Sequence, residues 1–139
     1  MTAEETIRAY VEAFNAGDVD ALAALYAPAT EYRQPFLPSA LTSPADIKAF
    51  EAGMFGGFSD VRVELAWIVA DGDRAAAGAI IAATHSAAMP LPDGGELPAT
   101  GAHIRLETAE HIRVDASGGI VEHQRYMDSG AFMRQLGIA

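Results

Sequence analysis

Two carboxylates in the second half of the chain stand where acid–base chemistry is possible. In the segment 102–114 apolar and polar residues alternate, and Glu110 falls on the apolar parity, which should face the core. A buried carboxylate costs several kcal/mol unless it is paired or functional. A β-bulge in this segment would shift the parity and bring His111 inward instead. The sequence leaves both arrangements open.

The second carboxylate, Asp128, closes the segment 120–128 and precedes an apolar helical tail that contains Phe132. Asp128 can be the N-cap of that tail or a working acid in a cavity, and the two roles are compatible. Neither parity of the segment is clearly apolar. His123 and Arg125 are not on the parity that we expect to face the core, so we expect them at the surface or at a dimer interface.

A carboxylate in an apolar cavity suits the removal of a proton next to a carbonyl group. An aspartate in water, with a pKa of about 3.9, is a weak base, and burial raises the pKa toward the working range. The enolate that forms needs a hydrogen-bond donor, for which His111, Tyr126 and Tyr32 are candidates. The reaction requires neither a metal nor a cofactor.

These residues must be positioned by helices and strands, and the helices come first in the chain. Capping residues, prolines and glycines bound three helical segments, within residues 2–17, 18–28 and 43–57. In the first and third, apolar residues recur with the spacing of one helix face. We therefore expect three N-terminal helices, each with one face against a core.

After residue 60 the apolar period changes to two, which indicates strands at 61–69, 74–89, 102–114 and 120–128. Helices followed by hairpin-connected strands predict an α+β domain, with the helices on one face of an antiparallel sheet. The second strand is unusually rich in alanine. Small side chains there would leave room for a ligand, or let a helix or a second subunit approach closely.

Composition limits the partners. The chain has 139 residues, enough for one domain, and a formal net charge of -10, which argues against nucleic acid. It contains no cysteine and no apolar run long enough to cross a membrane. We expect a non-secreted, cytoplasmic protein. The histidine spacing does not favour a metal site.

Five stretches, taken in order along the chain, resemble one family. They are YVEAFNAGDVDALAALYAPATEY, DGDRAAAG, ATHS, LPATG and EHIRVDASGGIVEHQRYMDSGAFMRQLG. This set is similar to the SnoaL-like polyketide cyclases, within the superfamily of cone-shaped α+β barrels that includes ketosteroid isomerase, scytalone dehydratase and limonene epoxide hydrolase. The resemblance implies one domain over residues 1–139, with three helices on a strongly curved antiparallel or mixed sheet that forms a barrel with an internal pocket. It also implies a short C-terminal helical tail and a homodimer through the outer face of the sheet.

The resemblance also implies roles for individual residues. Asp128 matches the general acid/base of the cyclases, and His111 resembles the histidine that binds or polarises the substrate. His85 matches a histidine of the central strand. Gln124 stands where the family commonly has a large aromatic residue, a gap that Tyr126 could fill.

Our first hypothesis is therefore a cofactor-independent cyclase, isomerase or lyase that acts on a small hydrophobic carbonyl or polyketide-like compound. One alternative is a limonene-type epoxide hydrolase, with Asp128, Glu110 and Arg105 supplying two carboxylates and an arginine. Another is a non-catalytic ligand-binding or dimerisation module. The expected substrate-binding residues are Tyr32, Phe50, Met54, Trp67, His85, Glu110, Gln124 and Tyr126.

Overall fold

The computed structural model describes residues 1–138, which form four helices, one five-stranded sheet and a small two-stranded ladder. The helices are α1 (Ala3–Ala16), α2 (Val19–Ala24), α3 (Pro44–Gly57) and α4 (Ser129–Leu136). The strands are β1 (Tyr26–Arg33), β2 (Phe58–Asp71), β3 (Arg74–His85), β4 (Met89–Pro90), β5 (Glu96–Leu97), β6 (His103–Val114) and β7 (Ile120–Met127). The predicted α+β class, the three N-terminal helices and the helical tail are confirmed.

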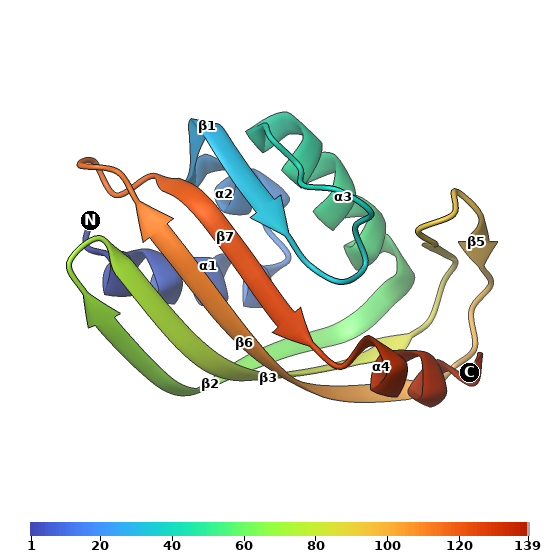
Figure 1. Cartoon of the computed structure of the whole chain (residues 1–139). Helices are drawn as coiled ribbons and strands as arrows, with labels where there is room; N and C mark the ends of the chain where they lie inside the picture. Colours follow the sequence, from blue (N-terminus) through green and yellow to red (C-terminus); the bar gives the residue numbers. More distant parts are fainter. Residues whose placement is uncertain (139) are drawn as a thin grey trace.

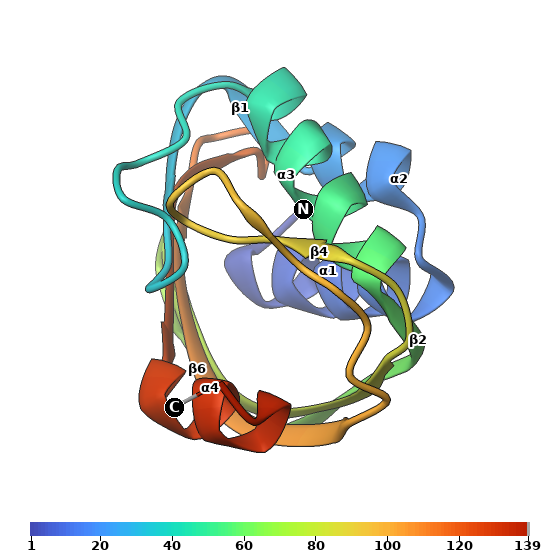
Figure 2. The ribbon, with the colours of Figure 1, turned by 90° about the vertical axis from the view of Figure 1, so that its right-hand side faces the viewer.

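The five-stranded sheet has the order β1-β7-β6-β3-β2 and is mixed, because β1 pairs with β7 in parallel while the other neighbours are antiparallel. The sheet bends strongly around α1 (Figures 1 and 2), as a cone-shaped fold requires. Within the described residues the sheet does not close into a barrel, since β1 and β2 remain its edges.

The helices begin and end where the sequence supplies caps. Thr2 and Glu5 form a capping box at the start of α1, and Gly17 ends the helix with a φ of 64°. The Ser43 side chain accepts a hydrogen bond from the backbone of Asp46 at the start of α3. These local signals explain why the helices could be predicted from sequence.

The alanines of β3 serve two purposes. Ala75 and Ala77 are buried together with Ile7 and Phe14 of α1, so small side chains let the helix approach the sheet. Farther along the same face, Ala83 lines a cavity. The small side chains of β3 therefore let a helix approach at one point of the strand and border a cavity at another.

Two of the register shifts in the sheet decide which side chains of β2 and β7 face inward. In β2 the register shifts between Leu65 and Trp67, so Ala66 is an extra residue and Trp67 lies on the outer face of the sheet with 50% of its surface exposed. In β7 an extra residue, Val121, stands between the partners of Arg113 and Val114.

The bulge in β7 turns His123 and Arg125 to the inner face, where both are buried. The prediction that they lie at the surface or a dimer interface was therefore wrong, because that prediction assumed unbroken alternation. Tyr126, the next residue, points outward and is 58% exposed.

The strand β4 of the two-stranded ladder lies beside α3 (Figure 2), with Met89 fully buried and its Cα close to Gly57. A Cβ at Gly57 would stand 2.8 Å from the Cβ of Met89, so this close approach requires glycine. Among residues 1–138, none of the helices has the length and apolar character needed to cross a membrane.

Candidate active site

An apolar cavity of about 80 Å³ lies between α3, α4 and the inner face of the sheet. Its polar wall residues are Gln34, Glu51 and Arg125. Most of the remaining wall is aromatic or formed by long apolar side chains, notably Phe14, Phe36, Phe55, Phe58, Phe132 and Met54. A pocket of this kind, largely apolar with a few polar groups, is typical of small-molecule sites.

The carboxyl group of this cavity belongs to Glu51 of α3. Glu51 is 3% exposed, and the Tyr32 hydroxyl donates a hydrogen bond to its Oε1 at 3.2 Å. Burial raises the pKa of the Glu51 carboxyl, and the nearby charge of Arg125 and the Tyr32 hydrogen bond oppose that rise without cancelling it. Glu51 is thus a carboxyl group whose proton affinity is increased by an apolar site.

Glu51 was not among the residues predicted from sequence, although a signal was present. It follows Ile47 by four positions and precedes Met54 by three, so it lies on the buried face of α3. Like Glu110 in its strand, a carboxylate on an apolar helix face is costly to bury unless it is paired or functional. The answer required knowing that the cavity lies against this face.

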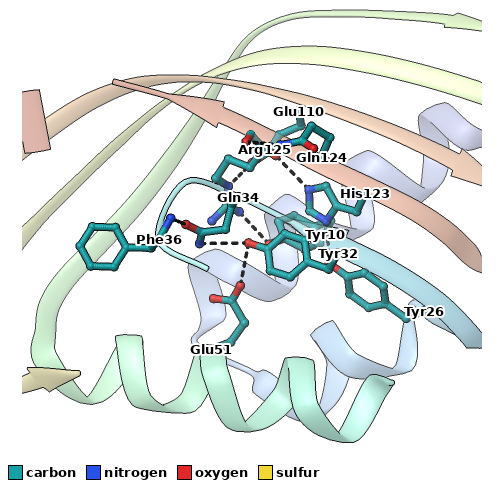
Figure 3. Close-up of polar contacts among 10 residues, drawn as sticks. All are labelled: Tyr10, Tyr26, Tyr32, Gln34, Phe36, Glu51, Glu110, His123, Gln124 and Arg125. Atoms are coloured by element: carbon teal, nitrogen blue, oxygen red, sulfur yellow. Dashed lines mark hydrogen bonds and ion pairs between the residues drawn. The ribbon is translucent and has the colours of Figure 1, made fainter. Parts of the chain in front are cut away.

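A buried network holds Arg125 (Figure 3). Its Nε donates to Oε1 of Glu110 at 2.6 Å, and its Nη2 donates to the Tyr10 hydroxyl at 2.8 Å. The other oxygen of Glu110, Oε2, is 2.9 Å from Nε2 of His123, and Nδ1 of His123 is 2.6 Å from the Tyr26 hydroxyl. Four buried side chains from α1, β1, β6 and β7 therefore position one guanidinium.

The charges of the network follow from its contacts. Burial pushes the pKa of Glu110 upward, but the Arg125 charge and the contacts with His123 outweigh it, so this pKa lies below its ordinary value. Burial lowers the pKa of His123 despite the opposing effect of Glu110. Glu110 is then an ionised acceptor and His123 is neutral. The proton of His123 belongs on Nε2, toward Glu110, and its Nδ1 accepts from Tyr26.

Two donors remain available at the polar side of the cavity. The hydrogen bonds made within residues 1–138 use Nε and Nη2 of Arg125, which leaves Nη1 for a ligand. Gln34 is held in place because its Oε1 accepts a hydrogen bond from the backbone N–H of Phe36 at 2.9 Å and its Nε2 donates one to the Tyr32 hydroxyl at 3.4 Å. The second N–H of the Gln34 amide remains for a ligand. Figure 3 shows Gln34, Glu51 and Arg125 on neighbouring sides of Tyr32.

Asp128 lies at the first turn of α4 and is not part of the cavity wall. It accepts a hydrogen bond from the backbone of Ala131 at 2.9 Å, and its side chain is 69% exposed. The predicted N-cap role is confirmed. A catalytic role for Asp128 stays a prediction.

His111 lies on the outer face of β6, and its Nε2 is 3.2 Å from Nη1 of Arg74. The register of β6 with β3 and with β7 is regular around this point, so no bulge turns His111 inward. Glu110 is the inward residue of the pair. The structure therefore separates His111 from the cavity, and its predicted role in substrate binding is untested.

The expected substrate-binding residues divide into three groups. Met54 lines the cavity, while Tyr32 contacts Glu51 and Phe50 packs against Tyr32 at 6.4 Å. Glu110 lies behind the cavity, in the network. His85 is buried beyond Phe58, and its Nδ1 is 2.9 Å from the Thr100 hydroxyl.

The third group lies away from the cavity. Trp67, Gln124 and Tyr126 are on the outer parity of their strands. Arg105 is exposed on the outer face of β6.

The arginine that contacts a buried carboxylate is Arg125, which pairs with Glu110. Of the three residues predicted for the epoxide hydrolase alternative, only Glu110 is buried, while Asp128 and Arg105 are exposed.

The comparisons with known proteins agree with this fold. Residues 7–123 match the SnoaL-like domain, and the chain therefore belongs to that family. The structure is similar to a proposed SnoaL-like polyketide cyclase from Jannaschia sp., with a TM-score of 0.84 and 17% identity over 99% of this chain and 92% of that one. None of the curated proteins compared matches this chain.

Two further solved structures share this fold. A proposed polyketide cyclase from Pseudomonas putida is 28% identical, with a TM-score of 0.77 over 97% of this chain and 98% of that one. An LEH-like epoxide hydrolase from Mycobacterium tuberculosis is 17% identical, with a TM-score of 0.71 over 96% and 88%. The family and its fold are thus established for this chain, while one fold of this kind carries more than one reaction.

Proposed function

We propose that this protein is a cofactor-independent general acid/base enzyme, an aldol-type cyclase, isomerase or lyase that acts on a small hydrophobic carbonyl compound. The observation that supports this most is Glu51, a buried carboxyl with a raised pKa on the wall of an apolar cavity. A general base works best when its pKa lies near the working pH, and burial moves a glutamate in that direction.

In this proposal Glu51 removes a proton from the carbon next to the substrate carbonyl. The negative charge then develops on the carbonyl oxygen, where Nη1 of Arg125 and the Gln34 amide donate hydrogen bonds. The protonated Glu51 returns the proton to the same or a neighbouring carbon. Tyr32 keeps the carboxyl oriented through its hydrogen bond to Oε1.

The buried network preorganises Arg125. A guanidinium placed in an apolar site by fixed partners need not reorient when the oxyanion forms. Glu110 and Tyr10 fix two of its nitrogens, and His123 fixes Glu110 in turn. These three are positioning residues, because they act through Arg125.

Proton transfer can be tested before the substrate is known. We would incubate the protein with 2-acetonaphthone in D₂O and follow exchange of the methyl protons by NMR. We expect Glu51→Gln, which keeps the shape of the side chain, to reduce the enzyme-dependent exchange rate by roughly 100-fold or more. The matched control is Glu107→Gln on the exposed face of β6, which should stay within about twofold of wild type.

Three outcomes are distinguishable. Loss of exchange only in Glu51→Gln supports Glu51 as the base. Equal exchange in both variants overturns that assignment, and a loss in Asp128→Asn instead would move the role to Asp128. If the wild-type protein binds the ketone without any exchange, the ligand-binding module is the better description.

Epoxide hydrolysis is a second candidate, favoured by the arrangement around Arg125. Glu110 contacts this arginine directly, and the charge of the same arginine acts on Glu51. In this reaction Glu51 would take a proton from water while the water oxygen attacks an epoxide carbon and the ring C–O bond breaks. The ring oxygen, released as an alkoxide, would take that proton back from Glu51 to give a diol. Diol formation from styrene oxide that depends on Glu51, without ketone exchange, would favour this candidate.

We further propose that the protein is a homodimer through the outer face of the sheet. Tyr126, Ala109, Gly78 and Trp67 are successive partners across β7, β6, β3 and β2 and form one row on this face. The row carries two large exposed aromatic side chains around small residues. A chain without cysteine suits the cytoplasm, where we expect such a dimer to act.

A further inference from the structure

The helix α4 forms one wall of the cavity. Phe132 and Leu136 are its buried side chains, and Phe132 lines the cavity. We propose that α4 is a hinged wall that opens to admit the ligand, and that the side-chain amide of Gln135 is the latch that keeps it shut. Because this inference concerns access to the cavity, it applies to an enzyme and to a ligand-binding module alike.

The latch is a pair of hydrogen bonds between Gln135 and the backbone of Arg105 in β6. The N–H of Arg105 donates to Oε1 of Gln135 at 2.7 Å, and Nε2 of Gln135 donates to the Arg105 carbonyl at 3.0 Å. The last pairing between β6 and β7 joins Thr108 to Met127, so Arg105 lies beyond the end of β7. The Gln135 amide therefore takes the place of a neighbouring strand and ties α4 to the end of β6 (Figure 1).

The other end of α4 is suited to act as the hinge. The helix follows β7 through Asp128 alone, and its second residue is Gly130. Glycine is a poor helix former, so the first turn depends on the Asp128 cap. Segments that open locally have few buried apolar side chains and an exposed backbone. Most residues of α4 are partly or fully exposed, which fits this description.

The volume of the cavity gives the reason for a moving wall. A cavity of about 150 Å³ holds one benzene molecule. The cavity here measures about 80 Å³, so it is too small to enclose such a ring while α4 is in place. An enclosed cyclic ligand therefore requires that part of the wall give way.

Phe132 occupies the space that such a ligand would need. The centroid of its ring lies 5.1 Å from that of Phe36 and 6.1 Å from that of Phe58, and both of these rings also line the cavity. Phe36 precedes α3 and Phe58 begins β2, so Phe132 closes the gap between two other elements. Displacement of α4 withdraws this ring and enlarges the cavity at that point.

Access to the cavity can be measured with one introduced cysteine, because the chain contains none. Ala83→Cys places a thiol on the cavity wall, and Ala82→Cys places one on the opposite face of β3. We would follow the reaction of each thiol with 4,4′-dithiodipyridine, an uncharged aromatic disulfide that releases a coloured thiopyridone as the mixed disulfide forms. The rate at Ala83→Cys relative to Ala82→Cys reports how often the cavity is open.

The latch is tested by adding Gln135→Met, which keeps the length of the side chain and removes both hydrogen bonds. We expect this variant to raise the labelling rate of Ala83→Cys by about tenfold or more and to leave that of Ala82→Cys unchanged. Gln135→Glu, which removes the donated hydrogen bond, is the milder substitution if the methionine variant does not fold, and it should accelerate labelling as well.

The matched control is Asn15→Leu. The Asn15 amide of α1 makes the same pair of hydrogen bonds with Val63 on the edge strand β2, at 2.6 and 2.9 Å. Its loss removes as many hydrogen bonds as Gln135→Met without acting on α4. We therefore expect Asn15→Leu to change the labelling rate of Ala83→Cys by less than about twofold.

Two results would overturn the proposal. A labelling rate at Ala83→Cys that does not respond to Gln135→Met would mean that the cavity is entered from another side. Equal acceleration by Gln135→Met and Asn15→Leu would mean that labelling follows unfolding of the whole domain.

The labelling experiment uses no substrate, so its failure differs from failure of the proposed function. If labelling depends on Gln135 but the wild-type protein catalyses no ketone exchange, only the proposed reaction is wrong. If exchange is observed and labelling does not depend on Gln135, only the role of α4 is wrong.

Discussion

The ion pair between Glu110 and Arg125 offers the sharpest test of the site, through the variant Glu110→Ala. This change removes the acceptor of two hydrogen bonds, from Arg125 at 2.6 Å and from His123 at 2.9 Å. It also leaves the guanidinium buried without its counter-charge. Removing one partner of a buried pair costs about 3–5 kcal/mol.

For a chain of this length that loss corresponds to a fall in Tm of roughly 6–20 °C. We would measure it by urea titration and by thermal unfolding, with Glu107→Ala as the control. Glu107 is on the same strand but exposed, so its variant should stay within about 0.5 kcal/mol of wild type. The double variant Glu110→Leu/Arg125→Met removes both charges and should recover a large part of the loss.

The pH dependence gives an independent check. Because the pKa of Glu110 is lowered by folding, its stabilisation is present above the ordinary glutamate value of about 4.3 and is lost as the pH falls through the lower, folded value. The gap between wild type and Glu110→Ala should therefore narrow in acid. A cost below about 1 kcal/mol, or a double variant no more stable than the single one, would refute the described network.

Three other predictions concern separate parts of the molecule. Because folding raises the pKa of Glu51, wild type loses stability as the pH rises from the ordinary glutamate value through the folded one. At neutral pH Glu51→Gln should therefore be the more stable protein. Wild-type kcat/KM should rise over the same pH range, and flat profiles of urea unfolding and of rate would contradict both expectations. Asp128→Ala should cost about 1 kcal/mol by uncapping α4 while Asp128→Asn costs little, and equal losses in unfolding experiments would argue against the cap. Trp67→Ala should shift the protein toward monomers in analytical ultracentrifugation without changing ligand affinity, and an unchanged sedimentation coefficient would remove Trp67 from the proposed interface.

Much of the fold follows from local signals. The caps at Thr2, Asp18 and Ser43 place three helices, and the change to a period of two near residue 60 marks the strands that follow α3. The strand β1, which precedes α3, was not predicted from the sequence. The ordered motifs indicate the family. Even the carboxylate on the buried parity of β6, Glu110, is apparent from the sequence, because alternation holds without interruption along that strand.

The remaining site residues depend on information that is not local. Whether Arg125 and His123 face inward depends on the bulge at Val121, and Trp67 faces outward because of the bulge at Ala66. A one-residue slip in pairing reverses every later side chain of a strand, and the slip is decided by the neighbouring strand.

The sequence by itself determined the α+β class, the limits of the first and third helices, the family and the presence of a carboxylate on an inward-facing parity. The second helix ends at Ala24, before the predicted stop at Pro28, which lies in β1. Only the tertiary structure decided that Glu51 is the carboxyl of the cavity and that Arg125 lies close to it. Glu51 comes from α3 and Arg125 from β7, far apart in the chain. Their association arises from the curvature of the sheet and its packing on the helices, which no short stretch of sequence encodes.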